Sequence, residues 1–367
     1  HNAADGAFGD AIERVYVWRA RGLLDELGVQ KFLELAGEEP GRKPERQKEY
    51  FDRLKNLAVE SGRPVTFGMP SVRVAPDLFR GYYELANETA AAGGRMFVQT
   101  HSRSISTLLS FKSHTPFDAW EFWSEIRSKP LDEQKRLMAD PAVKRRMVDV
   151  ASAPYNGPKI VGAEPRPPEW DWVYLLNAIG DETQMSEVGA QRGVHPAEAM
   201  IDIALERDFD VFFRQPLANE NQDHVLEMMR HPRSVVTFSD SGAHVAQIMD
   251  SSLQTHLLSH WVRDRQAFPL EDAVRLITFD TASAWGLHDR GLIREGLNAD
   301  LVVFDPDTID QNMPELLNDL PAGAARLKQT AKGIHATIVN GKVLLRDNEP
   351  TGDLPGRLVR GPLAQQA

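Results

Sequence analysis

An alternation of helix-like and strand-like segments between residues 50 and 238 constrains the fold more than any other feature of this chain. The expected order is helix 50–58, strand 64–67, helix 78–86, strand 96–99, strand 210–213, a helix from Asn219 to the break at His231-Pro232, and strand 235–238. Apolar residues recur at helical spacing in the helices and form short continuous runs in the strands. This alternation is typical of βαβ units with a parallel sheet, either an open doubly wound sheet or a (β/α)8 barrel. Both architectures place functional residues at the carboxyl ends of strands.

Two regions depart from this alternation of helices and strands. Residues 111–153 are rich in charge and tryptophan and predict a helical insertion, which is either a lid or a packed excursion. After residue 290 the sequence becomes β-rich, and Asn340-Gly341 between two apolar runs predicts a hairpin, because both residue types tolerate positive φ. We therefore expect an α/β domain over residues 1–290 and a small β domain over residues 291–367.

Composition excludes several classes of function. The net charge is −11 and no long basic run occurs, so a nucleic-acid partner is not expected. No apolar stretch is long enough to span a membrane. The chain has no cysteine, which excludes disulfides, thiolate metal sites and a cysteine nucleophile, and fits a cytoplasmic location. A homo-oligomer remains possible.

Asp240 follows the apolar run 235–238 and is surrounded by small residues. A carboxylate at the carboxyl end of a strand can bind a divalent metal or accept a proton from the hydrolytic water. The alternative is that Asp240 caps a turn through backbone N–H groups. His244, four residues later, is a candidate for substrate binding or metal ligation, although an exposed histidine is the commoner outcome.

A second polar segment follows the strand at 96–99. His101 is a candidate metal ligand because imidazole suits zinc. Arg103 is a candidate clamp for a substrate carboxylate, and Gln99 a candidate substrate-binding residue. The alternative is a loop with a structural salt bridge. His256 and His260 share one helix face, but no glutamate lies between them as in the metalloprotease pattern, so packing is favoured for this pair.

Several sequence blocks together resemble the amidohydrolase superfamily, in particular its D-aminoacylase (N-acyl-D-amino-acid deacylase) branch. The blocks are Ser239 to His244, Trp261 to Arg265, Leu270 to Arg275, Gly286 to Ile293, Ala299 to Asp305 and Val339 to Gly341. The resemblance implies a metal-bearing (β/α)8 barrel with a small β domain. It also implies that Asp240 is the metal ligand and proton acceptor of the last barrel strand.

The sequence departs from that pattern in its N-terminal part. The family's first barrel strand carries a His-x-His pair of metal ligands, and no His-x-His occurs in this chain. We therefore expect these residues to be the C-terminal part of a longer protein whose barrel is incomplete here at its N-terminus. The ligand role of His101 rests on its chemistry alone.

The sequence leads to one functional hypothesis and two alternatives. The hypothesis is a hydrolase that uses one or two Zn²⁺ ions, or another divalent metal, to cleave the amide bond of a small N-acyl-D-amino acid. The first alternative is another amidohydrolase that acts on a cyclic amide or imide. The second is a non-catalytic barrel used for binding or assembly.

Asn219 is further expected to cap the helix that follows it.

Overall fold

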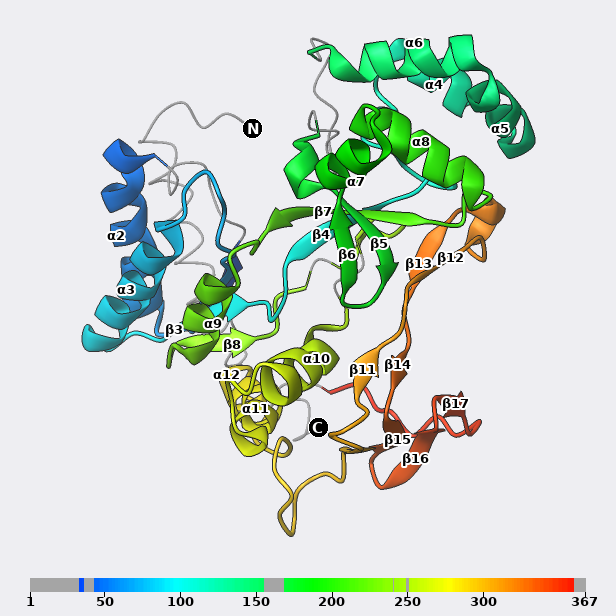
Figure 1. Cartoon of the computed structure of the whole chain (residues 1–367). Helices are drawn as coiled ribbons and strands as arrows, with labels where there is room; N and C mark the ends of the chain where they lie inside the picture. The colour runs from blue at the N-terminus through cyan, green and yellow to red at the C-terminus, as the bar shows by residue number, and fades with distance from the viewer. Residues whose placement is uncertain (1–32, 36–42, 155–167, 240, 249–250, 360–367) are drawn as a thin grey trace.

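A parallel sheet forms one side of the molecule. The computed structural model describes residues 33–35, 43–154, 168–239, 241–248 and 251–359. The sheet has the strand order β1-β2-β3-β8, and all neighbouring pairs are parallel. Its strands are β1 (Leu33–Leu35), β2 (Val65–Gly68), β3 (Met96–Thr100) and β8 (Ser234–Val236). Helices α2 (Pro44–Ser61), α3 (Leu78–Ala91) and α9 (Gln222–Arg230) lie around it (Figure 1).

The helices and strands expected between residues 50 and 99 are confirmed. The buried side of α2 carries Tyr50, Leu54 and Ala58, which recur at intervals of four residues. The helix ends at Gly62, whose φ of 63° lies in the left-handed region that glycine adopts without steric cost. All five residues of β3 are buried. The helices therefore supply the apolar cover that a parallel sheet needs.

A second sheet is antiparallel and lies between the parallel sheet and a layer of helices. Its order is β4-β7-β5-β6. The strands are β4 (Ile105–Leu109), β5 (Tyr174–Ala178), β6 (Asp181–Gln184) and β7 (Phe212–Ala218). The strand expected at 210–213 thus exists as β7, but its expected place in the parallel sheet is wrong. Phe213 pairs antiparallel with both Leu109 and Leu175, because the chain enters a second sheet at β4 instead of continuing the βαβ repeat.

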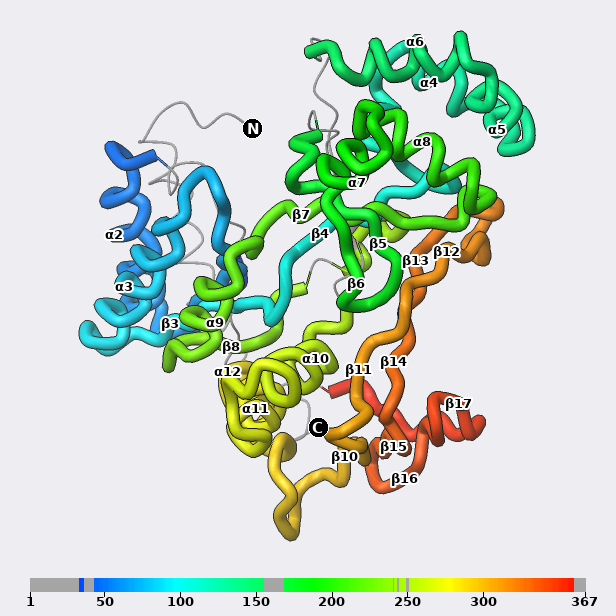
Figure 2. The backbone as a smooth tube through the Cα atoms, viewed as in Figure 1, coloured from blue at the N-terminus to red at the C-terminus, as the bar shows by residue number. Residues whose placement is uncertain are grey.

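Helices from two parts of the chain cover the second sheet (Figure 2). They are α4 (Glu121–Arg127), α5 (Leu131–Ala139), α6 (Pro141–Ser152), α7 (Met185–Arg192) and α8 (Pro196–Glu206). Together with the short 3-10 turn η2 (Trp170–Trp172), they surround a hydrophobic core of their own, in which Trp123, Phe117 and Phe213 are fully buried. The segment 111–153 is therefore a packed helical layer in this structure.

A further group of helical segments packs against the parallel sheet. It comprises α10 (Leu253–His256), the π-helical η3 (Leu257–Asp264), α11 (Leu270–Arg275), the π-helical η4 (Leu276–Asp280) and α12 (Thr281–Ala284). Both η4 and α12 contact β8. Trp261 of η3 is 1% exposed and belongs to the same core as Tyr50 and Val98.

The remaining residues form a β region without long helices. One sheet has the order β10-β15-β16-β17, and two ribbons pair β11 with β14 and β12 with β13. The strands are β10 (Leu301–Phe304), β11 (Asp310–Gln311), β12 (Glu315–Leu317), β13 (Arg326–Lys328), β14 (Ala331–Lys332), β15 (Ile334–Val339), β16 (Lys342–Arg346) and β17 (Glu349–Pro350). Asn340 and Gly341 have φ values of 48° and 76° between β15 and β16, which confirms the expected hairpin.

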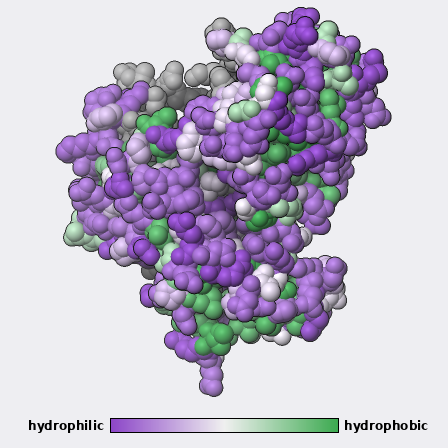
Figure 3. All heavy atoms as spheres, viewed as in Figure 1, coloured by the Kyte–Doolittle hydropathy of each residue, from purple (hydrophilic) through white to green (hydrophobic). Residues whose placement is uncertain are grey.

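The α/β class and the C-terminal β region are confirmed. Within the described residues the parallel sheet has four strands and does not close on itself, so the eight-stranded barrel and the boundary at residue 290 stay predictions. No helix in the described part of the chain is both long and apolar enough to cross a membrane. In Figure 3 most of the visible face is hydrophilic, and hydrophobic residues gather toward its lower end.

Candidate functional site

The chain leaves β3 and β8 at the same edge of the parallel sheet. These strands are direct neighbours, with Thr100 opposite Val236, and the N–H of Phe238 donates to the carbonyl oxygen of Thr100 at 3.1 Å. Residues 101–104 then connect β3 of the parallel sheet to β4 of the antiparallel sheet. This connection lies where functional residues of open α/β sheets gather, beyond the carboxyl ends of the strands.

Three hydrogen bonds hold this connecting loop in place. Ser102 Oγ donates to the carbonyl oxygen of Leu253 at 2.6 Å, and Trp261 Nε1 donates to the carbonyl oxygen of Ser102 at 2.6 Å. Asn219 Nδ2 donates to the carbonyl oxygen of Arg103 at 3.3 Å. Asn219 thus positions the loop, and its expected role as a helix cap is wrong. Asn221 caps α9 instead, because its side chain accepts from the first turn of that helix.

For both expected metal ligands the role stays a prediction. Asp240 lies outside the described residues, so its role stays a prediction. His101 is completely buried, and its Nδ1 accepts a hydrogen bond from the Arg103 N–H at 3.0 Å. A neutral His101 then carries its proton on Nε2. To bind a metal through Nε2, His101 would have to move this proton to Nδ1 and so lose the hydrogen bond from Arg103.

The other expected residues separate in space. Gln99 is buried; its Nε2 donates to Glu34 Oε1 at 2.8 Å, and its Oε1 accepts from Thr237 Oγ1 at 3.4 Å. His244 is exposed at the end of β9 (Ser241–His244), with a φ of 49°. Of these residues, only Arg103 lines the cavity described next. Substrate binding by Gln99 and His244 stays a prediction.

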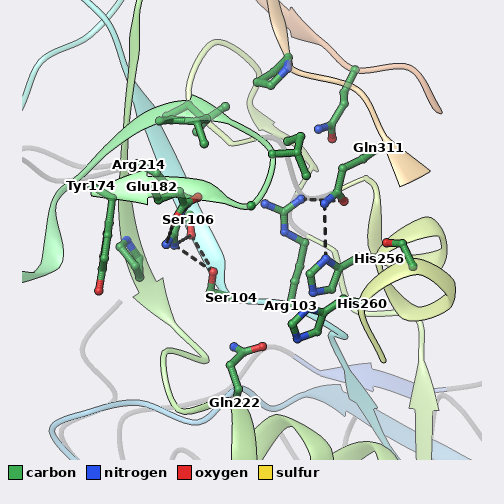
Figure 4. A pocket seen from close by; sticks show the side chains of 18 of the residues that line it. Arg103, Ser104, Ser106, Tyr174, Glu182, Arg214, Gln222, His256, His260 and Gln311 are labelled. Atoms are coloured by element: carbon green, nitrogen blue, oxygen red, sulfur yellow. Dashed lines mark hydrogen bonds and ion pairs between the residues drawn. The ribbon is translucent and has the colours of Figure 1, made fainter. Parts of the chain in front are cut away.

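A cavity of about 370 Å³ lies between the antiparallel sheet, the segment α10–η3 and the ribbon β11–β14. Its volume is within the range of sites for small molecules. Figure 4 shows Arg103 beside Gln311, with His256 and His260 next to them. Arg103 Nη1 donates to Ser252 Oγ at 2.6 Å and to Gln311 Oε1 at 3.4 Å.

A partly buried ion pair forms the opposite wall. Arg214 of β7 pairs with Glu182 of β6, with nitrogen–oxygen distances of 2.5, 2.8 and 3.0 Å. The same guanidinium donates to Ser104 Oγ and Ser106 Oγ at 3.1 Å, and its Cζ lies 4.7 Å from the centre of the Tyr174 ring. The planar fork of arginine suits this arrangement, because it satisfies a carboxylate and an aromatic face together.

The interpretation from sequence missed two histidines in the cavity wall. His256 and His260 stack with ring centres 4.8 Å apart and planes inclined by 12°. Burial lowers the pKa of both imidazoles, and the pKa of His256 falls well below its ordinary value with a further contribution from the charge of Arg103. Their spacing of four residues was visible in the sequence, but packing was favoured and their exposure to a cavity could not be inferred.

A bound metal has no evident set of ligands in the part of the chain that the structure describes. No group of three or more His, Cys, Asp or Glu side chains is placed there to hold one. His101 has its Nδ1 engaged by a backbone N–H, as described above. The described donor set therefore does not fit a metal centre, and no chemical step is derived through one.

Known proteins resemble parts of this sequence. Residues 175–345 match the model of an amidohydrolase family. The chain is 30% identical over 180 residues to an N-acyl-D-aspartate deacylase of Alcaligenes xylosoxydans xylosoxydans, which covers 48% of this chain and 31% of that protein. It is 38% identical over 103 residues to a D-aminoacylase of the same organism, which covers 28% of this chain and 19% of the relative.

Over part of its length the chain is similar in sequence to amidohydrolases of the D-aminoacylase branch. A solved structure of a D-aminoacylase with a binuclear metal centre superposes with a TM-score of 0.48 at 19% identity, covering 89% of this chain and 55% of that one. The match to this amidohydrolase family includes Arg214, His256, His260 and Gln311, but begins after Arg103. The chain spans about a third or less of the length of the curated relatives it matches.

Proposed function

We propose that this amidohydrolase cleaves the amide bond of a small N-acyl-amino acid, with an N-acyl-D-amino acid as substrate. The single observation that carries the proposal is the adjacency of β3 and β8, which brings the loop bearing Arg103 to the edge where the chain continues toward Asp240. A carboxylate-binding cation and a proton-accepting carboxylate are the two groups that such a reaction needs. The relationship to the deacylases supports the choice of reaction.

The proposed roles follow from the chemistry of the side chains. Arg103 lines the cavity and binds the substrate carboxylate through its guanidinium N–H groups. Asp240 accepts a proton from the hydrolytic water and passes it to the leaving nitrogen. We also propose dependence on a divalent metal, with zinc as the ion. Residues beyond those that the structure describes would have to hold it, and zinc would supply activated water at neutral pH.

A panel of substrates tests the reaction. The purified protein is assayed with N-acetyl-D-amino acids, N-acetyl-L-amino acids and cyclic amides, and its metal content is measured in parallel. We expect turnover of the D-series, loss of turnover after chelation, and recovery with Zn²⁺. Turnover of cyclic amides alone would replace the proposed substrate class. Full activity of metal-free protein would remove the metal from the proposal.

A substitution tests the role of Asp240. Asp240→Asn keeps the size of the side chain but cannot accept the proton of the water, so we expect kcat to fall by about 10³-fold. The melting temperature should change little. Near wild-type turnover by the metal-replete variant would remove Asp240 from the mechanism.

A further inference from the structure

The stacked pair His256–His260 leaves two polar atoms without partners. Nε2 of each ring is buried and accepts or donates no hydrogen bond within the described residues. Both residues line the cavity, together with Arg103 and Gln311 (Figure 4). Buried polar atoms are almost always hydrogen-bonded in proteins, so two such atoms in one cavity wall indicate a ligand that completes them.

The hydrogen-bond network determines which ring nitrogen of His256 carries the proton. A guanidinium can only donate, so Gln311 must present Oε1 to Arg103 Nη1, which lies 3.4 Å away. The NH₂ group of Gln311 then faces His256 Nδ1 at 3.4 Å and donates to it. Burial lowers the pKa of His256 well below its ordinary value, so the ring is neutral at pH 7. Its single proton is therefore on Nε2.

We propose that His256 is a substrate-binding residue whose Nε2–H donates to the carboxylate of the acylated amino acid, beside the guanidinium of Arg103. Gln311 is a positioning residue that holds both donors through one amide. This inference rests on the proposed function, because it assigns the residues that hold that substrate. A carboxylate is the expected group because its oxygens accept from a guanidinium and an N–H at once.

The charges of the cavity further restrict the ligand. Four carboxylates line it, those of Glu182, Glu220, Asp264 and Asp310, against the two guanidinium groups of Arg103 and Arg214. Each of these carboxylates has a cation within 4.0 Å: Glu182 pairs with Arg214, Glu220 with Arg73, Asp264 with Arg263 and Asp310 with Lys332. A ligand with one negative charge is favoured over a dicarboxylate in such surroundings. N-acetyl-D-leucine is therefore the probe, and N-acetyl-D-leucinamide is its counterpart without a carboxylate.

Substitution of Gln311 reverses the tautomer of His256 without touching the ring. In Gln311→Glu a carboxylate faces Nδ1 and accepts a hydrogen bond from an Nδ1–H, so that Nε2 presents a lone pair toward the ligand. Gln222→Glu is the matched control, because Gln222 lines the same cavity but bonds the carbonyl oxygen of Asn219. It adds the same charge while leaving the His256 network intact. The difference between the two variants isolates the effect of the tautomer.

The experiment measures KM and kcat for N-acetyl-D-leucine, and its dissociation constant by calorimetry, in four variants. We expect His256→Phe to raise KM and the dissociation constant by about 10- to 100-fold relative to wild type, with a smaller change in kcat. We expect Gln311→Glu to raise both constants by about the same factor relative to Gln222→Glu. His256→Gln retains a donor near the position of Nε2 and should recover part of the loss. Binding of N-acetyl-D-leucinamide should respond little, and melting temperatures establish that each variant is folded.

The outcomes separate this inference from the proposed function. Hydrolysis with the same KM in wild type, His256→Phe and Gln311→Glu would overturn the role of His256 while leaving the deacylase activity. Binding of N-acetyl-D-leucine that depends on His256, without hydrolysis of any acyl-amino acid, would support the inference and overturn the function. No binding to the wild-type protein would overturn both.

Discussion

The parallel sheet and the C-terminal antiparallel sheet are built from similar residues but bury them very differently. Val65 of β2 and Val98 of β3 are 0% exposed, whereas Val302 and Val303 of β10 are 55% and 48% exposed. Helices α2, α3 and α9 connect or flank the parallel strands and cover them, while hairpins and short loops connect the C-terminal strands. Whether a strand is buried here therefore depends on whether helices connect or flank it, and not on its own hydrophobicity.

The two regions meet at the candidate site. Gln311 of β11 bonds Arg103 of the β3–β4 loop and His256 of α10. Arg263 of η3 also donates to the carbonyl oxygen of Ile309 at 2.6 Å and lies 3.8 Å from Asp310. The exposed β region thus contributes one edge of a cavity whose other walls belong to the body of the molecule.

The largest effect is expected from a truncation in the parallel sheet. Phe67 of β2 is 2% exposed and contacts Tyr82 with ring centres 5.2 Å apart. Phe67→Ala removes the ring and leaves a cavity, so we expect the free energy of unfolding to fall by about 3–5 kcal/mol. Denaturant unfolding measures the loss. A loss below about 1 kcal/mol would contradict the close packing of this sheet.

A glycine substitution tests whether every part of the exposed C-terminal region tolerates change. The backbone of that region is tightly packed at one point. Gly333 has a φ of 73°, and a Cβ atom there would lie 2.5 Å from the backbone nitrogen of Ile309. Gly333→Ala therefore combines a left-handed conformation, costing roughly 1–2 kcal/mol, with a steric conflict of roughly 1–3 kcal/mol.

Gly341→Ala is the matched control for Gly333→Ala. Its φ is 76°, but the nearest atom to an added Cβ is 3.9 Å away. Thermal unfolding should show the conformational cost alone for this variant. Equal losses in the two variants would indicate that the contact at Ile309 relaxes freely.

One isosteric substitution, made in both sheets, tests burial directly. Val98→Thr places a hydroxyl in a fully buried strand and is expected to cost about 1–3 kcal/mol. Val302→Thr makes the same change on an exposed strand, where we expect a change within about 0.5 kcal/mol. Urea unfolding of both variants gives the two values. A large effect at Val302 would show that its face of β10 is covered in solution.

The smallest expected effect concerns pH at the junction of the regions. Burial lowers the pKa of His256 well below its ordinary value, so the unfolded chain binds a proton before the folded protein does. The stability that depends on neutral His256 is complete above about pH 6.5 and is lost progressively as the pH falls toward the folded-state pKa, by at most about 1.4 kcal/mol per pH unit. Comparison of unfolding at pH 7.5 and 5.5 should show a smaller loss for His256→Gln than for wild type.

Identical pH dependence of wild type and His256→Gln would indicate that His256 is solvated, and that its Nε2 needs no ligand to be satisfied.

Local patterns predicted the elements well where neighbouring residues decide them. The helical spacing of Tyr50, Leu54 and Ala58, the stop at Gly62 and the Asn340-Gly341 hairpin all depend on backbone preferences and on one apolar face, which the sequence displays directly. The direction of β7 could not be inferred in this way. An apolar run reads the same in a parallel and an antiparallel sheet, and only its pairing with β4 and β5 distinguishes them.

The sequence by itself determined the residue types of the candidate site: a cation at Arg103, a carboxylate at Asp240 and the alternation that brings such groups to strand ends. Only the tertiary structure decided which of them share a cavity. Arg103 and Gln311 are 208 positions apart, and Gln311 and His256 are 55 apart. The proton of His256 is placed by those two partners, and hydrogen bonds between such distant segments exist only once the chain has folded, so no local pattern can report them.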